Sequence, residues 1–319
     1  MSRVLALLDG RGLDATATEL LEVAGRVAGG LGARLEVVRS GALEEPELGA
    51  LGALGVRRVH HLAERPGSTA ELAGALEPLL SAPDAAALLA TTSFPARELA
   101  ARLGARLGAG VLVDALHLEV VDGRVVADRT SFAASWGSRC EVRVAPAVLT
   151  VKPHATAVGP RPEAVAAPEL VPLAPGAPDA RVRVLDRTER SASGRPDLAT
   201  AGVVVAGGRG LEGDFSLLEE LADEIGAAVG ATRVAVDEGW VGHELQVGQT
   251  GVTINPVLYI GAGISGAVHH VGGMRAARTV VAINTDPDAP LMEIADYAVV
   301  GDLRSVLPRL TARLRELRS

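Results

Sequence analysis

Three glycine-rich segments in the second half of the chain stand beside side chains that can bind phosphate. Gly207-Gly208-Arg209-Gly210 and Gly261-Ala262-Gly263-Ile264-Ser265-Gly266 each follow an apolar run typical of a buried strand, and Gly248-Gln249-Thr250-Gly251 is expected in a loop. Glycine lets backbone N–H groups approach a pyrophosphate closely, and the start of a following helix favours its negative charge. The segment 261–266 has the spacing G-x-G-x-x-G of dinucleotide-binding turns, although a tight turn in a glycine-rich chain would have the same spacing.

Polar side chains at predicted strand ends could complete such a site. Arg209 is expected at the end of one strand and Arg233 at the start of another, where each could pair with a phosphate or simply be solvated. Asn284 and Asp302 follow apolar runs and could contact a ribose or an adenine, but strand-end Asn and Asp are also ordinary caps.

Other kinds of chemistry are disfavoured. His269 and His270 follow the glycine turn and could face its ligand, but none of the seven histidines has metal-ligand spacing backed by carboxylates. The hydrolase elbow G-x-S-x-G is absent, because the residue after Ser265 is already Gly266. No nucleophile, acid-base pair or metal set therefore emerges beside the turn.

Composition narrows the possible classes of protein. The 319 residues suffice for two domains, and with only seven aromatic residues the cores must be built from Ala, Val, Leu and Ile, which suits layered α/β packing. A net charge of −8 argues against nucleic acid as a partner. The lone Cys140 fits a reducing compartment, and the first apolar run is too short for a signal peptide, so a cytoplasmic location is expected. The uncharged segment 245–268 holds Gln, Asn, Pro and five glycines, so no membrane insertion is expected.

Alternating strand and helix patterns predict a doubly wound parallel sheet in the first half. The predicted elements are strands 3–8, 34–38, 56–62 and 86–90 and helices 16–28 and 68–80. Strands 116–120, 124–128 and 140–144 are expected to extend this sheet in antiparallel fashion, with a hairpin turn at Asp122-Gly123. Seven prolines between 153 and 178 favour extended chain, and the polar stretch 188–196 is the expected domain boundary.

The alternation restarts after this boundary. Residues 202–206 read as a strand, and 215–229 as a helix capped by Asp214 and ended by Gly230. The predicted fold is therefore two three-layer α/β domains, 1–190 and 191–319, each a mostly parallel Rossmann-like sheet with helices on both faces.

The second half of the chain contains a series of short motifs in a fixed order. They are Gln246-Val247-Gly248-Gln249-Thr250-Gly251, Leu258-Tyr259-Ile260, Gly263-Ile264-Ser265-Gly266-Ala267, Gly273-Met274, Ala282-Ile283-Asn284, Asp286-Pro287, Ala289-Pro290, Ala295-Asp296-Tyr297 and Asp302-Leu303. Taken together, these motifs resemble the α subunit of electron-transfer flavoprotein. The resemblance is tight from about residue 202 to the C-terminus and looser before, where Thr92-Ser93-Phe94, the run 97–103 and Val113-Asp114 are similar to the family's N-terminal domain. It favours an electron carrier over an enzyme that converts a substrate.

This resemblance implies an α/β heterodimer in which domain 191–319 holds most of one FAD and domain 1–190 is a scaffold that contacts the β subunit. Electrons would arrive from flavin dehydrogenases, typically of acyl-CoA, and leave toward a membrane quinone oxidoreductase. In the family a threonine hydroxyl bonds flavin N5, and an arginine and a histidine lie near the N1 and C2 carbonyl edge. The implied FAD contacts are Arg209, Thr232, Arg233, Gln246, Val247, Gly248, Gln249, Thr250, Gly263, Ile264, Ser265, Gly266, Ala267, His269, His270, Asn284, Asp302 and Leu303.

Three departures from the family pattern and two alternative functions stand beside this interpretation. His269 replaces a usual glutamine, Thr232 a common serine, and Val252 a frequent basic residue. Because His269 stands directly before His270, either of them could be the functional histidine.

One alternative is an NAD- or FAD-dependent oxidoreductase that converts its own organic substrate. The other is a regulatory module that binds a nucleotide in the N-terminal domain, which is disfavoured because Asp9-Gly10-Arg11-Gly12 after the first strand is short and acidic.

Overall fold

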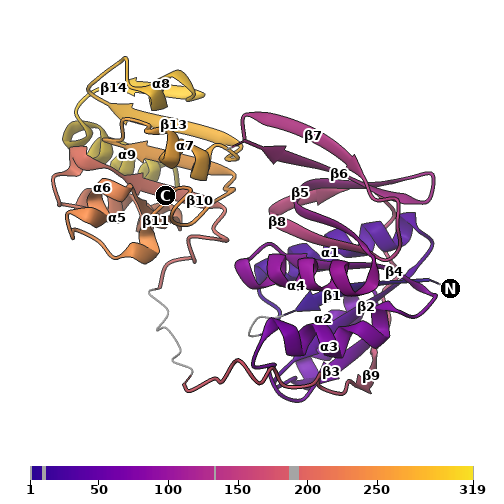
Figure 1. Ribbon diagram of the computed structural model, residues 1–319. Helices are drawn as coiled ribbons and strands as arrows, with labels where there is room; N and C mark the ends of the chain where they lie inside the picture. The colour runs from indigo at the N-terminus through magenta and orange to yellow at the C-terminus, as the bar shows by residue number, and fades with distance from the viewer. Residues whose placement is uncertain (1, 9–11, 133, 187–193, 319) are drawn as a thin grey trace. The chain divides into compact units, whose positions relative to one another are not determined.

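A computed structural model describes residues 2–8, 12–132, 134–186 and 194–318 (Figure 1). Residues 1–129 with 137–188 form one compact unit, and residues 130–136 with 189–319 form the other. Most of the predicted boundary 188–196 lies outside the described residues, as do Asp9, Gly10 and Arg11 of the short acidic segment. The units are described separately below as the first and the second unit.

The first unit is built on a nine-stranded sheet of order β7-β6-β5-β8-β4-β1-β2-β3-β9 among the described residues. Strands β9, β3, β2, β1, β4, β8 and β5 pair in parallel, and β6 pairs antiparallel with β5. The strands are β1 Arg3–Leu8, β2 Arg34–Ser40, β3 Val56–Leu62, β4 Ala85–Thr91, β5 Gly110–Val121, β6 Arg124–Ser131, β7 Trp136–Glu141, β8 Ala147–Ala157 and β9 Glu169–Pro172. The helices are α1 Ala15–Gly30, α2 Glu45–Ala53, α3 Thr69–Leu80 and α4 Phe94–Leu107.

Side chains of β1 alternate between two apolar cores, which places helices on both faces of the sheet. Val4, Ala6 and Leu8 pack with α1 and α2, whereas Leu5 and Leu7 pack with α3 and α4. This alternation follows from the two-residue repeat of a strand. The predicted three-layer, mostly parallel arrangement is confirmed for this unit.

The predicted strand 140–144 was wrong in position. The strand there is β7, which ends at Glu141 and is largely exposed, so it lacks the buried alternation that marks a strand in sequence. The buried strand that follows, β8, was not predicted, and neither were helices α2 and α4. The hairpin at Asp122-Gly123 is confirmed, with both residues at positive φ. Strand β9 and the end of β8 agree with the predicted extended chain at 153–178.

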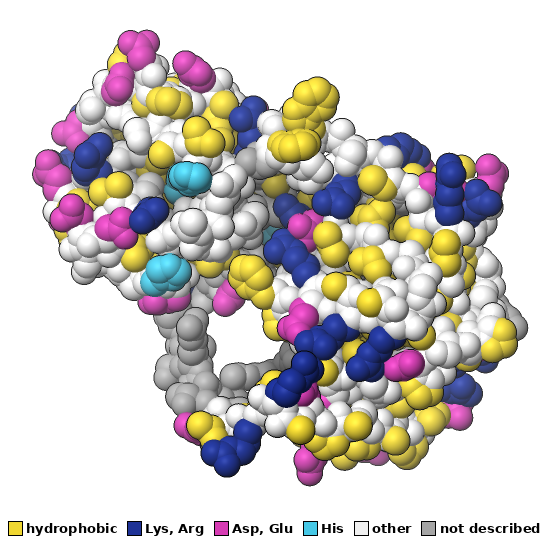
Figure 2. Space-filling view, in the orientation of Figure 1, with side chains coloured by type: hydrophobic (Ala, Val, Ile, Leu, Met, Phe, Trp, Pro, Cys, Tyr) yellow, Lys and Arg dark blue, Asp and Glu magenta, His cyan; other side chains and the backbone are white. Residues whose placement is uncertain are grey.

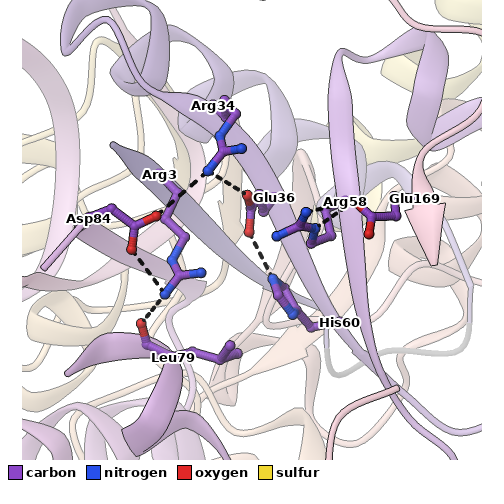
Figure 3. A network of polar contacts seen from close by, with 8 residues as sticks. All are labelled: Arg3, Arg34, Glu36, Arg58, His60, Leu79, Asp84 and Glu169. Carbon is purple, nitrogen blue, oxygen red and sulfur yellow. Dashed lines mark hydrogen bonds and ion pairs between the residues drawn. The ribbon is translucent and has the colours of Figure 1, made fainter. Parts of the chain in front are cut away.

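A buried polar network lies where β1, β2 and β3 run side by side (Figure 3). The Glu36 carboxylate, only 1% exposed, is 2.8 Å from His60 Nε2 and 3.7 Å from Arg34 Nη2. Arg34 and the buried Arg3 both reach Asp84, at 3.6 and 3.3 Å. Burial raises the pKa of Glu36, but the His60 hydrogen bond and the charges of Arg58 and Arg3 outweigh it and lower that pKa below 4.5. The network therefore keeps the buried Glu36 side chain ionised.

The second unit is a five-stranded parallel sheet of order β11-β10-β12-β13-β14. Helices α7 and α8 pack in one apolar core and α5 and α9 in another, so this unit also has three layers, as predicted. Its strands are β10 Val203–Gly207, β11 Ala228–Ala231, β12 Leu258–Ala262, β13 Thr279–Asn284 and β14 Tyr297–Val300. Its helices are α5 Ser216–Ile225, α6 Arg233–Asp237, α7 Val268–Met274, α8 Pro290–Glu293 and α9 Leu303–Arg318, with 3₁₀ turns η1 Arg209–Leu211 and η2 His243–Leu245.

The predicted helix 215–229 was too long. Helix α5 ends at Ile225, because Gly226 adopts φ +67° and the buried residues 228–231 form β11 instead. Asp214 is not the N-cap residue, although its carboxylate accepts a hydrogen bond from Ser216 N at 3.0 Å. Arg233 was expected at a strand start but begins the short helix α6 after β11.

Charged side chains of both signs are interspersed on the face shown in Figure 2, which therefore carries no extended basic surface. Within the described ranges, none of the helices is both long and apolar enough to span a bilayer.

Candidate cofactor site

A cavity of about 640 Å³ opens in the second unit at the carboxyl ends of its strands. The chain runs from β10 outward to β11 and then returns to β12 on the other side of β10, so the strand order reverses between β10 and β12. Doubly wound sheets bind ligands in the crevice at such a reversal. The cavity volume is in the range of pockets for small molecules and cofactors.

All but one of the predicted contact residues line this cavity. The exception is Gln249, which lies next to the wall: its N–H donates to His269 O at 2.9 Å, and its side-chain oxygen is 3.0 Å from His269 Nδ1. The predicted residues in the lining are Arg209, Thr232, Arg233, Gln246, Val247, Gly248, Thr250, Gly263, Ile264, Ser265, Gly266, Ala267, His269, His270, Asn284, Asp302 and Leu303.

The segments that follow β10 and β12 meet backbone to backbone at the floor of the cavity. Gly210 N donates to Gly263 O at 3.1 Å, and Gly208 N donates to Ala262 O at 3.1 Å. A methyl group on Gly210 would come within 2.8 Å of Gly263 Cα, and Gly263 itself adopts φ +63°. Only glycines allow this approach and this backbone conformation, so the sequence pattern G-x-G-x-x-G has its expected structural setting.

The loop 246–251 forms one wall of the cavity and is held against α7. The buried Gln246 donates from Nε2 to Thr250 Oγ1 at 3.0 Å. In this hydrogen bond the Thr250 oxygen is the acceptor. The Thr250 hydroxyl proton is therefore not used in it and can be donated to another group. A methyl group on Gly273 of α7 would come within 2.4 Å of Gly248 Cα, so the loop and the helix are in direct contact.

The two neighbouring histidines lie in different environments. His270 is 5% exposed, and its ring nitrogens lie 2.7 Å from Tyr259 Oη and 3.0 Å from Val247 O. Burial lowers the pKa of His270 to about 4, so this ring is neutral near pH 7. His269 is exposed and contacts Gln249. Tyr259 was part of a quoted motif but had no predicted role.

Cationic side chains stand at the edge of the cavity. Arg233 Nε is 3.2 Å from Asp237 Oδ2, and Arg304 Nη2 is 2.6 Å from Glu212 Oε2. The Arg209 side chain makes no hydrogen bond or ion pair with the rest of the described chain. These guanidinium groups give the cavity the donors that phosphate groups require.

Thr232 lines the cavity, but its hydroxyl oxygen is not exposed to it. Thr232 Oγ1 is inaccessible to solvent and makes no hydrogen bond within the described ranges. The groups that fit a dinucleotide are therefore the glycine backbone, which leaves room for a pyrophosphate, and the arginines at the cavity edge.

Asn284 and Asp302 have structural contacts in addition to lining the cavity. Asn284 donates to Ile264 O at 3.0 Å and accepts from Asp286 N, whereas Asp302 accepts from Arg304 N at 2.9 Å. Both therefore act as local caps, which was the alternative considered for them.

Eight lining residues were not predicted. Most are chain neighbours of predicted ones, and Asp237 could have been found because it stands four residues after Arg233 on one helix. They are Gly210, Glu212, Val234, Asp237, Thr285, Asp286, Gly301 and Arg304. No group of three metal-ligating side chains occurs in the described parts of the chain.

Comparison with known families shows which family the chain belongs to. Residues 4–176 match the electron transfer flavoprotein domain family, and residues 197–275 match the electron transfer flavoprotein FAD-binding domain family. The chain belongs to the electron transfer flavoprotein α-subunit family. The matched FAD-binding domain contains the glycine floor and the loop 246–251, so the cofactor of this unit is FAD.

Individual relatives agree with this membership. The chain is 41% identical to electron transfer flavoprotein subunit alpha of Syntrophomonas wolfei over 72% of this chain and 73% of that one. It is 43% identical to the Mycobacterium leprae subunit alpha over 72% and 71% of the two chains. Over 40% of this chain and 42% of the other, it is 53% identical to the Paracoccus denitrificans subunit alpha.

Proposed function

We propose that this chain is the α subunit of a heterodimeric electron carrier that holds most of one FAD in the cavity of the second unit. The observation that carries the proposal is the cavity itself, which brings together the glycine floor, the loop 246–251 and the arginine side chains at the strand-order reversal. The relatives are named as subunits alpha, which supports a β-subunit partner.

Each part of the cavity has a distinct task in this proposal. The backbone around Gly263 leaves room for a pyrophosphate, and Arg209 supplies charge to it. The Thr250 hydroxyl, whose oxygen accepts from Gln246, donates toward the cofactor ring. Bound FAD would supply one-electron transfer between partner proteins. The protein residues bind and orient this cofactor and set the charge around it.

The proposal extends to the proteins that bind this chain or exchange electrons with it. Residues 1–190 serve as a scaffold for the β subunit, and residues 191–319 carry FAD. Electrons enter from flavin dehydrogenases such as those of acyl-CoA and leave to a membrane quinone oxidoreductase. One cysteine in 319 residues supports a reducing compartment, which we take to be the cytoplasm.

Co-purification with the β subunit tests the proposal. We expect a yellow heterodimer with the visible absorption of one flavin held in the α chain. Electrons should reach this flavin only through a partner flavoprotein, whereas an oxidoreductase with its own organic substrate would be reduced directly by NAD(P)H. A colourless heterodimer that also fails to take up added FAD would refute the proposal.

Replacing Arg233 by alanine is expected to lower the potential of the first one-electron reduction of bound FAD by tens of millivolts. A positive charge in the cavity wall favours the added electron, and a contribution of about 1.4 kcal/mol corresponds to about 59 mV. Redox titration measures the change. Arg313→Ala removes an equally exposed guanidinium from α9, outside the cavity, and should leave the potential unchanged. Equal potentials in the two variants would rule out this role for Arg233.

A further inference from the structure

Tyr259 lies beneath the cavity wall and is one of only two tyrosines in the chain. It belongs to β12, is fully buried, and does not itself line the cavity. Its hydroxyl is 2.7 Å from His270 Nε2. A buried phenol requires a hydrogen-bond partner, and this histidine supplies it.

The partners of His270 determine which ring nitrogen carries the proton. Val247 O lies 3.0 Å from Nδ1, and a carbonyl oxygen can only accept, so Nδ1 must donate. Because the ring is neutral, Nε2 then has no proton and must accept from the Tyr259 hydroxyl. Burial supports the neutral form by lowering the pKa of His270 and raising that of Tyr259. The chain of donors thus runs from Tyr259 through His270 to Val247.

Val247 links this chain of hydrogen bonds to the cavity wall. It begins the turn that presents Thr250, and its own N–H donates to Ala231 O at 2.9 Å. The adjacent Gly248 touches Gly273 of α7, so a small movement of His270 in that helix would be transmitted to the loop. The hydrogen bond from His270 Nδ1 to Val247 O therefore holds the loop 246–251 near its start.

We propose that Tyr259 is a positioning residue of the FAD site: its hydroxyl donates to Nε2 of the Nδ1–H tautomer that Val247 O selects and so holds the ring in place, and His270 in turn anchors the loop 246–251 through Val247 O. Both ring nitrogens of His270 are engaged inside the protein. His270 consequently contributes a fixed neutral surface to the cavity. The inference rests on the proposed FAD-binding function of this cavity.

The tautomer is tested in the heterodimer assembled from the full chain, labelled with ¹⁵N-histidine, and unlabelled β subunit. The ring nitrogen signals of His270, identified by their loss in His270→Gln, should show a protonated Nδ1 and an unprotonated Nε2 near pH 7. In Tyr259→Phe the Val247 carbonyl still selects Nδ1–H, but the buried Nε2 loses its donor, so we expect the signal of the unprotonated Nε2 to shift. An Nε2–H tautomer in the unmodified protein would overturn the proposal, whatever the stability of Tyr259→Phe.

FAD affinity provides the second readout. Tyr259→Phe should weaken FAD binding by roughly 3- to 10-fold, the range of one lost hydrogen bond. Tyr297→Phe removes the other tyrosine hydroxyl, on the exposed strand β14 outside the cavity, and should bind FAD as tightly as the unmodified protein. Equal affinity in both variants, or an unchanged His270 Nε2 signal in Tyr259→Phe, would overturn the positioning role. Absence of FAD binding in the unmodified heterodimer would refute the proposed function instead, while the tautomer could still be observed.

Discussion

Replacement of Gly263 by alanine is expected to weaken FAD binding at least tenfold, or about 1.4 kcal/mol. The new methyl group would lie 2.8 Å from Gly210 Cα and 2.9 Å from Leu303 Cδ2, at a residue whose φ is +63°. Backbone atoms cannot yield as a flexible side chain would, so the segments after β10 and β12 must separate and the floor of the cavity must change shape. Titration of the heterodimer with FAD, followed by flavin fluorescence, measures the loss.

Gly226→Ala is the matched control for this substitution. Gly226 ends α5 at φ +67°, almost the same backbone conformation, but no heavy atom lies within 4 Å of the added methyl group. Both variants carry the same left-handed strain of about 1–2 kcal/mol, which affects stability. Only Gly263→Ala should affect FAD affinity. Similar affinities in the two variants would mean that the contact between the two segments does not shape the site.

Replacement of Glu36 by glutamine is expected to destabilise the first unit by about 2–3 kcal/mol. The substitution keeps the size of a side chain that is 1% exposed but removes the negative charge that faces Arg34 and the buried Arg3 (Figure 3). Without the Glu36 carboxylate, Asp84 is the remaining acidic partner of Arg3 and Arg34, so the buried positive charge is less well compensated. Native-state hydrogen exchange measures the opening free energy of amides in β2, while amides of β12 in the second unit should be unaffected.

The pH dependence of stability gives a second test of Glu36. Its pKa in the folded state lies below 4.5, so the folded state holds the carboxylate charged more strongly than the unfolded chain does. The stabilisation is therefore complete above the unfolded pKa and is lost as the pH falls from about 4.5 through the folded-state pKa. Glu36→Gln should lack this loss. Glu98→Gln, which breaks an exposed pair with Arg102, should leave the stability nearly unchanged because solvent screens that pair.

Apolar patterning predicted strands β1 and β3 with the bounds that the structure shows. Strand β1 is buried on both faces, so it is an uninterrupted apolar run after Arg3. Apolar patterning failed for helix α2 and for strand β11. Helix α2 contains Gly49 and Gly52, which are weak helix formers, so its sequence carries little helical signal. The buried Val229 continues the apolar face of α5 but belongs to strand β11, and periodicity alone cannot separate a helix from a short buried strand here.

The site was predictable wherever it depends on chain-local motifs. The glycine turn and the loop 246–251 were found from their residues, and they line the cavity together. The ion pair between Glu212 and Arg304 joins residues 92 positions apart, so only the folded sheet brings it to the rim. Likewise, Tyr259 and His270 are close in sequence, but their hydrogen bond depends on how α7 lies over β12.

The main-chain contact between Gly210 and Gly263 has a consequence for protein engineering. A library that randomises these glycines to change cofactor preference would yield mostly clones with a distorted cavity, because a side chain does not fit between the two peptide backbones. Diversity is better directed to the mouth of the cavity, at Glu212 and Arg304, where long exposed side chains can be exchanged without moving a peptide bond.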